Sequence, residues 1–353
     1  MRAFRLLGRE RAALQTVPRP VPGPGEALLR VGASAFCHSD VHHFESTLRP
    51  AGMNLPVTMG HELAGYVEAL GVGTDGPAVG SAVAVYIAHG CGRCPACSNG
   101  EDIYCDEGFG VPGVHFSGGM AEYVVVRAGN LVDAQGIDST TAAVLTDAGV
   151  TAHHAVAHGL RTVGSGGRAM VIGIGGLGHI AIQILRARSE AEILAIDVDS
   201  AHLELAIRLG AHEAHLAEDL ESRCARRSVD VVYDFVGSTE SLTAALRAVR
   251  PGGMLVVVGL GGGSLELAQG QPRGAWLGIP RNTTVVGSLL GTRADLEAVL
   301  EMARRSMLCV VSRTYSLDQA GRALEDVRAG RIVGRAVVVH GSAAVSDQRG
   351  TRA

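Results

Sequence analysis

The second half of the chain alternates short apolar segments with amphipathic ones. The apolar segments have the length of strands, and the amphipathic segments repeat their hydrophobic residues at helical spacing. Alternation at this pace predicts right-handed βαβ units and a parallel sheet. The expected strands are 169–173, 192–198, 230–237 and 254–259, and the expected helices are 177–188, 203–210 and 241–250.

The first 145 residues have a different pattern, in which short β segments are separated by glycine and proline. The Pro/Gly-rich stretch 17–26 excludes a helix or a central strand. After about Thr292 the pattern predicts two more helical stretches and a strand at 335–340, and the small, polar tail 341–353 is expected to be disordered. The strands expected in the first part are 27–34, 80–88 and 120–127.

A glycine-rich turn follows the strand at 169–173. GIGGLG, at Gly173–Gly178, fits G-x-G-x-x-G and opens a helix, so the backbone can approach a pyrophosphate closely. In a chain with 48 glycines, an ordinary βα turn is the alternative. Asp197 ends the next strand nineteen residues later, where a carboxylate binds ribose hydroxyls and repels a 2′-phosphate. NAD is therefore predicted over NADP. A helix N-cap is the alternative role of Asp197.

Four of the seven cysteines lie within fifteen residues. The thiolates of Cys91, Cys94, Cys97 and Cys105 can close a tetrahedral shell around one zinc ion. A disulfide framework suits a short secreted chain rather than one of 353 residues. An iron–sulfur cluster is the closer alternative, but the compact ferredoxin run ends with a spacing of about three residues and a proline, which this segment lacks. A structural zinc is therefore predicted.

Composition and charge argue against several classes of function. The length indicates two domains, and 47% hydrophobic with 19% charged residues describes a globular protein with a large interior. A net charge of −4 without a basic stripe argues against a nucleic-acid partner. No window is apolar enough for a signal peptide or a membrane span. We therefore expect a cytoplasmic protein whose thiols stay available for metal.

Three further residues are possible metal ligands, although each alone has a simpler explanation. Cys37 follows a predicted strand, His61 follows an extended segment, and Asp147 lies in LTDAGVTAHHA. A buried thiol, a core histidine and a helix cap are the simpler roles. Their order, their separation and the neighbouring glycines, however, are typical of one family.

The chain resembles the zinc-dependent medium-chain alcohol dehydrogenases, in particular bacterial secondary-alcohol dehydrogenases. The resemblance extends from Met1 to about His340. It implies an α/β fold with a GroES-like, β-rich catalytic domain and a Rossmann domain with a doubly wound parallel sheet. The motifs that carry it are CHSD (37–40), GHE (60–62), the four-cysteine segment, DAGVTAHHA (147–155) and GIGGLG (173–178). The implied catalytic domain is 1–147 and 292–340, with a zinc lobe at about 90–106, and the implied NAD-binding domain is 148–291.

The resemblance also implies a catalytic zinc held by Cys37, His61 and Asp147, which makes two zinc ions per subunit. The family's better-known site has two cysteines and one histidine. Aspartate replaces the second cysteine in this chain, so a hard carboxylate oxygen takes the place of a soft thiolate ligand. Glu62 would lie beside the metal as an exchangeable ligand or a supporting carboxylate.

Further roles are implied by positions that match the family's motifs. Asp40 would accept the ring N–H of His61 and fix the tautomer that binds zinc. Ser39 would take the proton of the alcohol, and His42 would pass it to solvent. His38 and Arg335 would contact the pyrophosphate, and Thr151 the nicotinamide. The full set of implied cofactor contacts is His38, Thr151, Gly173, Gly175, Gly176, Leu177, Gly178, Asp197, Val236, Gly259, Leu289 and Arg335.

These roles imply interconversion of alcohols, secondary or aryl, with ketones or aldehydes by hydride transfer from a zinc-bound alkoxide to NAD. A polyol or diol dehydrogenase of the same superfamily and a non-catalytic sensor that binds NAD and zinc are the alternatives. The family's assembly implies a homodimer or homotetramer through a strand at 283–290, and segment 259–280 would be a mobile loop or an interface. An apolar substrate pocket is expected from Leu48, Met53, Leu55, Ile87, Trp276 and Leu289.

Overall fold

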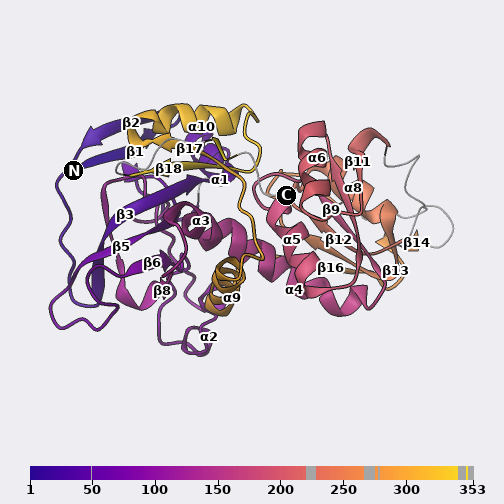
Figure 1. The fold of residues 1–353 in the computed structure, drawn as a ribbon, viewed down its shortest axis with the longest axis horizontal. Helices are drawn as coiled ribbons and strands as arrows, with labels where there is room; N and C mark the ends of the chain where they lie inside the picture. The colour runs from indigo at the N-terminus through magenta and orange to yellow at the C-terminus, as the bar shows by residue number, and fades with distance from the viewer. Residues whose placement is uncertain (49, 220–227, 266–274, 277–278, 341–346, 349–353) are drawn as a thin grey trace. The chain divides into compact units, whose positions relative to one another are not determined.

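The first and last parts of the chain fold together into one unit, and the middle of the chain forms another (Figure 1). The computed structural model describes residues 1–48, 50–219, 228–265, 275–276, 279–340 and 347–348. The first unit consists of Met1–Val150, Gly291–Ser306 and Val310–Ala353, and the second of Thr151–Leu290 and Met307–Cys309.

The eleven-residue strand β3 (Glu26–Phe36) is the centre of the first unit. It pairs antiparallel with β5 (Glu62–Leu70), β7 (Tyr123–Arg127) and β18 (Arg335–Val339). In Figure 1 the C-terminal strand β18 lies beside this N-terminal strand. The other strands of this sheet are β6 (Ala82–Val85), β8 (Leu131–Asp133), β17 (Ser312–Ser316) and β19 (Asp347–Gln348), and a smaller sheet contains β1 (Arg2–Gly8), β2 (Arg11–Thr16) and β4 (Val57–Thr58).

The core of this unit forms around β3, which contributes buried apolar side chains to two clusters. Phe36, at the end of β3, is buried and packs edge-on against Phe4 at a ring-centroid distance of 6.3 Å. Leu29 and Val31 belong to a second buried cluster. The helices and short turns of the unit are α1 (His38–Glu45), α2 (Pro95–Ser98), α3 (Ser139–Val144), a π-helical turn (Leu145–Gly149), α9 (Arg293–Arg304), α10 (Ala320–Arg328) and the 3₁₀ turns Asp102–Tyr104, Ala128–Asn130 and Leu317–Gln319.

The second unit contains a six-stranded sheet in the order β11-β10-β9-β12-β13-β16, and all its pairs are parallel. Because the order reverses between β9 and β12, the carboxyl ends of these two strands form the usual crevice for a nucleotide. The strands are β9 (Arg168–Ile172), β10 (Glu192–Asp197), β11 (Glu213–Leu216), β12 (Val229–Asp234), β13 (Val249–Val257) and β16 (Thr284–Gly287), with a separate hairpin of β14 (Ala275–Trp276) and β15 (Ile279–Pro280). The helices are α4 (Val150–Val163), α5 (Gly178–Arg188), α6 (Ser200–Arg208), α8 (Thr239–Ala248) and the 3₁₀ turn Ala217–Asp219.

Some element boundaries differ from the sequence-based ones. The helix expected to reach residue 250 ends at Ala248, and β13 already begins at Val249. Pro251 explains the difference, because a residue before proline is disfavoured in a helix. The predicted tail 341–353 lies outside the described residues except for β19, which pairs with β17. Among the described helices, none has the length and apolarity needed to cross a bilayer.

Candidate active site

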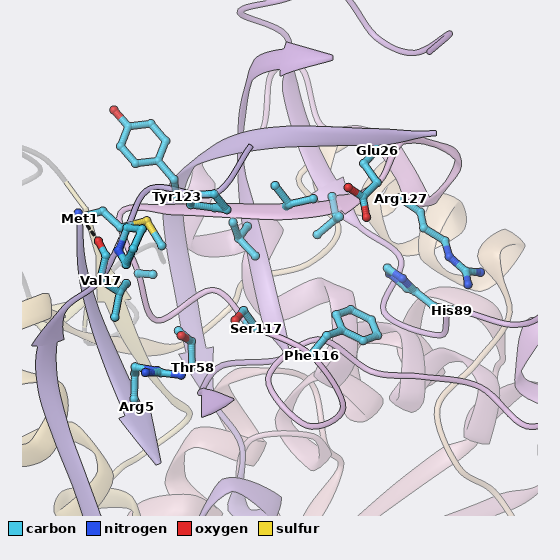
Figure 2. A pocket seen from close by; sticks show the side chains of 17 residues that line it. Met1, Arg5, Val17, Glu26, Thr58, His89, Phe116, Ser117, Tyr123 and Arg127 are labelled. Atoms are coloured by element: carbon cyan, nitrogen blue, oxygen red, sulfur yellow. Dashed lines mark hydrogen bonds between the residues drawn. The ribbon is translucent and has the colours of Figure 1, made fainter. Parts of the chain in front are cut away.

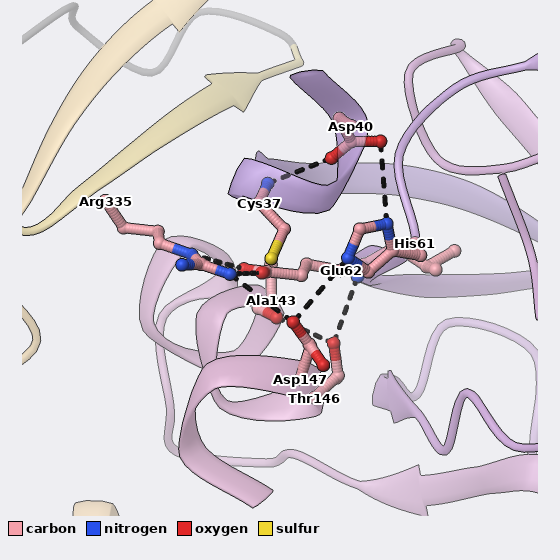
Figure 3. A network of polar contacts seen from close by, with 9 residues as sticks. Cys37, Asp40, His61, Glu62, Ala143, Thr146, Asp147 and Arg335 are labelled. Atoms are coloured by element: carbon pink, nitrogen blue, oxygen red, sulfur yellow. Dashed lines mark hydrogen bonds and ion pairs between the residues drawn. The ribbon is translucent and has the colours of Figure 1, made fainter. Parts of the chain in front are cut away.

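Four side chains with metal-binding groups converge at one point of the first unit. One ligand atom each of Cys37, His61, Glu62 and Asp147 lies within 4.8 Å of the other three. Figure 3 shows these side chains pointing toward one another. His61, Glu62 and Asp147 are buried, whereas Cys37 is partly exposed. The fold therefore combines a thiol, an imidazole and two carboxyl groups from separate segments.

One buried carboxylate orients two of these residues. Cys37 follows β3 and is the N-cap of α1, and its backbone N–H donates to Oδ2 of Asp40 at 2.9 Å. The other oxygen of Asp40, Oδ1, lies 3.5 Å from Nδ1 of His61. Asp40 therefore sets the position of the loop that carries Cys37 and faces the ring of His61.

Gly60 allows the chain to bring His61 into this position. Its φ of 90° lies in the left-handed region. A Cβ at Gly60 would lie 2.5 Å from Oγ of Ser34 and 2.7 Å from Cγ of Met120. A side chain at this position would therefore displace the backbone directly before His61.

Asp147 comes from the π-helical turn that continues α3. Turns of this kind widen a helix locally and are frequent at functional sites. The neighbouring Thr146 accepts the backbone N–H of Leu63 at 3.2 Å and donates to the carbonyl of Ala143 at 2.7 Å. The hydroxyl thus ties the turn that carries Asp147 to strand β5. The role of Thr146 was not predicted; the signal in the sequence that points to it is its position next to Asp147.

A buried guanidinium group pairs with the carboxylates of the cluster. Arg335, the first residue of β18, bonds to both oxygens of Glu62, and its Nη2 lies 3.4 Å from Oδ2 of Asp147. Burial raises the pKa of Glu62 to about 7; Arg335 opposes this rise and Asp147 adds to it. The contact of Arg335 with the pyrophosphate, implied by the family resemblance, stays a prediction. Its pairing with Glu62 was not foreseen.

The donor set fits a zinc ion. A tetrahedral zinc with bonds of about 2.0–2.3 Å separates its ligand atoms by roughly 3.3–3.8 Å, and Nε2 of His61 lies 3.5 Å from Oδ2 of Asp147. The opposite ring nitrogen faces a carboxylate, which is common for histidine ligands. Burial lowers the pKa of His61, but Asp40 and Asp147 together raise it well above its ordinary value. Metal binding would therefore displace a proton.

The clustered cysteines form a second candidate metal centre. Their sulfur atoms lie within 4.8 Å of one another, and all four are free thiols. The backbone N–H of Cys91 donates to Sγ of Cys105 at 3.2 Å. The N–H of Cys97 lowers the pKa of Cys94 to about 7, which favours the thiolate that binds metal. Four sulfur ligands leave no position for a substrate, so this centre fits a structural zinc.

The glycine-rich turn of the second unit connects β9 to α5. A Cβ at Gly173 would lie 2.6 Å from Cγ2 of Val236, and one at Gly178 would lie 2.0 Å from the carbonyl oxygen of Gly173. Nothing lies within 4 Å of a Cβ built at Gly175. The turn is therefore tightly packed at its two ends and open at Gly175, which fits a cradle for a dinucleotide pyrophosphate.

Asp197, at the end of β10, holds this turn in place. Its Oδ2 accepts the N–H of Ile174 at 2.6 Å, and its Oδ1 accepts the N–H groups of Val198 at 2.7 Å and Asp199 at 3.0 Å. Nδ1 of His202 lies 3.2 Å from Oδ1. The N-cap of α6 is Asp199, not Asp197. Neither the hydrogen bond from Ile174 nor the contact with His202 was predicted from the sequence.

Comparison with known proteins places the chain in a family. Residues 23–136 match the model of the alcohol dehydrogenase GroES-like domain, and residues 176–305 match the zinc-binding dehydrogenase model. An NAD-dependent alcohol dehydrogenase of Sulfurisphaera tokodaii is 33% identical, over 96% of this chain and 100% of the relative. The chain belongs to the zinc-dependent medium-chain alcohol dehydrogenases. The α/β fold with a GroES-like and a nucleotide-binding domain is thereby confirmed.

Two solved structures of similar proteins agree with this membership. The alcohol dehydrogenase of Aeropyrum pernix superimposes with a TM-score of 0.87 at 29% identity, and covers 96% of this chain and 100% of its own. The acetophenone reductase of Geotrichum candidum in complex with NAD has a TM-score of 0.82 at 28% identity, and the match covers 96% of this chain and 97% of the reductase.

Ser39 and His42, assigned from this family to proton transfer, and His38, assigned to the pyrophosphate, all lie on α1. His38 is exposed, Ser39 and His42 are partly exposed, and the rings of His38 and His42 pack edge-on at 5.2 Å. Nδ1 of His42 lies 3.0 Å from Oγ1 of Thr47. Thr47 orients this imidazole, and sequence analysis did not identify it.

The remaining residues assigned from the family are less closely grouped. Gly259, after β13, packs its backbone against Val236, after β12, since a Cβ at Gly259 would lie 2.2 Å from the carbonyl carbon of Val236. Leu177 is the N-cap of α5, Thr151 is buried in α4, and Leu289 is 56% exposed. Of the expected pocket residues, Met53 and Ile87 are buried, Leu55 packs on the core, Leu48 is exposed, and the side chain of Trp276 lies outside the described ones.

Proposed function

We propose that the chain is an NAD-linked alcohol dehydrogenase that interconverts secondary or aryl alcohols with ketones or aldehydes. The convergence of Cys37, His61 and Asp147 at one buried point, in a chain of this family, carries the proposal. The names of two similar proteins support it, since one is an NAD-dependent alcohol dehydrogenase and the other an acetophenone reductase in complex with NAD.

The residues around the cluster have distinct tasks in this reaction. A zinc ion held by Cys37, His61 and Asp147 would act as a Lewis acid that lowers the pKa of the alcohol hydroxyl. Ser39, two residues beyond Cys37 on α1, would accept the hydroxyl proton. His42, a partly exposed imidazole on the same helix, would deliver that proton to solvent. Thr47 holds Nδ1 of His42 at 3.0 Å and so fixes the ring for this transfer.

The second unit would bind the dinucleotide. NAD itself accepts the hydride, and the chain supplies the open turn at Gly175 and the carboxylate of Asp197. That carboxylate favours a ribose with free hydroxyls over one with a 2′-phosphate. The proposal also includes a cytoplasmic homodimer or homotetramer formed through β16, the exposed edge strand of the parallel sheet.

NADH formation on secondary, aryl and primary alcohols and on polyols tests the function. We expect secondary and aryl alcohols to give the highest kcat/KM. Cys37→Ser should abolish turnover while metal analysis still finds one zinc per chain, held by the cysteine cluster. Preferred turnover of polyols would replace the proposal with the polyol dehydrogenase. No turnover of any alcohol by protein that binds zinc and NAD would leave the sensor alternative.

A further inference from the structure

A pocket of about 640 Å³ lies along β7 in the first unit (Figure 2). All five residues of β7, Tyr123–Arg127, line it, so the pocket follows the length of the strand. None of the residues of the two candidate metal centres lines it. Its volume is within the range of sites that bind small molecules, and the proposed dehydrogenase reaction does not use it.

Part of the lining of this pocket is apolar. Val125, which alternates with the core residues of β7, is partly exposed, and Phe116 and Pro18 also line the pocket. Strand alternation explains why Val124 and Val126 join the buried core while Val125 faces outward. The pocket therefore offers apolar contact to the body of a ligand.

His89 and Arg127 lie close together at one end of the pocket (Figure 2). His89 is 6% exposed, and its ring packs against Phe116 at 4.9 Å. Burial, with help from the charge of Arg127, lowers the pKa of His89 to about 3, so the ring is neutral. Its Nε2 is buried and has no hydrogen-bond partner among the described residues. A buried polar atom without a hydrogen bond costs free energy, and a ligand that bonds to this atom would recover that free energy.

The charged side chains that line the pocket are mostly cationic. Arg127 is exposed and bonds to the carbonyl of Gly90, and Arg5 bonds to the carbonyl of Pro56 at 2.8 Å. In the described part of the chain, neither arginine forms an ion pair with a carboxylate. Glu26 is the lining acid; it lies opposite Arg127 in the register of β3 and β7, and its Oε2 accepts the N–H of Gly23 at 2.8 Å. Two guanidinium groups against one carboxylate leave the lining with a net positive charge.

We propose that this pocket binds a carboxylate with an apolar body, of the class of medium-chain fatty acids or arylalkanoic acids. The carboxylate accepts hydrogen bonds from the guanidinium of Arg127 and from Nε2–H of His89, an arrangement suited to a planar anion. The apolar body lies along Val125 and Phe116. The neutral ring and the apolar wall favour a singly charged carboxylate over a phosphate.

Calorimetric titration of the full chain with decanoate tests this site. A carboxylate can also bind at a catalytic metal, so the titration is repeated on Cys37→Ser, in which that metal is absent. We expect saturable one-site binding of decanoate to Cys37→Ser, and at least tenfold weaker binding of decanamide, which lacks the charge. Absence of saturable binding to Cys37→Ser would overturn the proposal, whether or not the protein oxidises alcohols.

Substitutions in the pocket locate the binding. Val125→Glu should weaken decanoate binding at least tenfold, whereas the nearly isosteric Val125→Gln should stay within about threefold of the native chain. Arg127→Met should also weaken it at least tenfold, and His89→Phe severalfold. If loss of the Gly90 contact prevents Arg127→Met from folding, the Val125 pair decides alone. Equal decanoate affinities of Val125→Glu and Val125→Gln would show that decanoate does not bind in this pocket.

Discussion

His61 lies between two buried carboxylates, with Asp40 on its Nδ1 side and Asp147 on its Nε2 side. Although burial opposes the charge, these carboxylates raise the pKa of His61. In the metal-free folded state the ring therefore stays protonated above pH 6.5, where the unfolded chain releases the proton. The stabilisation that the protonated His61 ring gives to the metal-free folded state is complete below pH 6.5. It is lost as the pH rises through the raised pKa of His61 in the folded state.

The same proton competes with zinc, so acid should release the catalytic ion first. We predict that a chelator removes one zinc per chain at least tenfold faster at pH 5.5 than at pH 8, because protonated His61 cannot bind metal. Zinc release is followed by the absorbance of the chelator complex. The Cys37→Ser variant, which keeps the other zinc, is the control and should lack this fast phase. A fast phase with the same rate at both pH values would contradict the prediction.

Asp197 combines two tasks that substitution can separate. We predict that Asp197→Gly lowers the ratio of kcat/KM for NAD to that for NADP at least tenfold, because the charge that repels a 2′-phosphate is lost. Asp197→Asn is the matched control: it removes the charge and leaves an oxygen that can accept the N–H of Ile174. Steady-state kinetics with both cofactors measure the effect. An unchanged ratio in both variants would show that Asp197 does not select the cofactor.

At the scale of elements, Thr146 connects the π-helical turn to β5. Thr146→Val should lower the free energy of unfolding by about 1–3 kcal/mol, because the buried N–H of Leu63 loses its acceptor. It should also lower kcat/KM, since the turn positions Asp147. Thr146→Ser keeps the hydroxyl and should behave nearly like the native chain. Denaturant unfolding and steady-state kinetics test both effects, and equal stability of the two variants would contradict this role.

The elements themselves could largely be predicted from the sequence, but the contacts between them could not. The glycine turn at Gly173–Gly178 and its flanking strand and helix follow from local hydrophobic spacing. The π-helical turn has no such signal, because its widening depends on tertiary contacts such as that between Thr146 and Leu63. The pairing of Arg335 with Glu62 joins residues 273 positions apart, and no local pattern reports such a separation.

At the scale of the whole molecule, that ion pair links the last part of the chain to the first. Arg335→Met should destabilise the protein by about 3–5 kcal/mol, because Glu62 then remains buried without its counter-charge. The double variant Arg335→Met, Glu62→Met should recover part of this loss, because it removes the buried charge as well. Urea denaturation of the single and double variants measures both. A double variant less stable than Arg335→Met would show that the unpaired charge of Glu62 is not the source of the loss.

The discontinuity of the first unit also sets an order of events during synthesis. The ribosome synthesises β3 early. Strand β18, which pairs with the end of β3 next to Cys37, is synthesised only after the whole second unit. The nucleotide-binding unit can therefore fold while the first unit still has an open sheet edge beside the nascent metal site. Translation must reach Val339 before that edge is closed and Arg335 can meet Glu62. The contacts around the candidate metal site are thus completed only after the second unit has been synthesised.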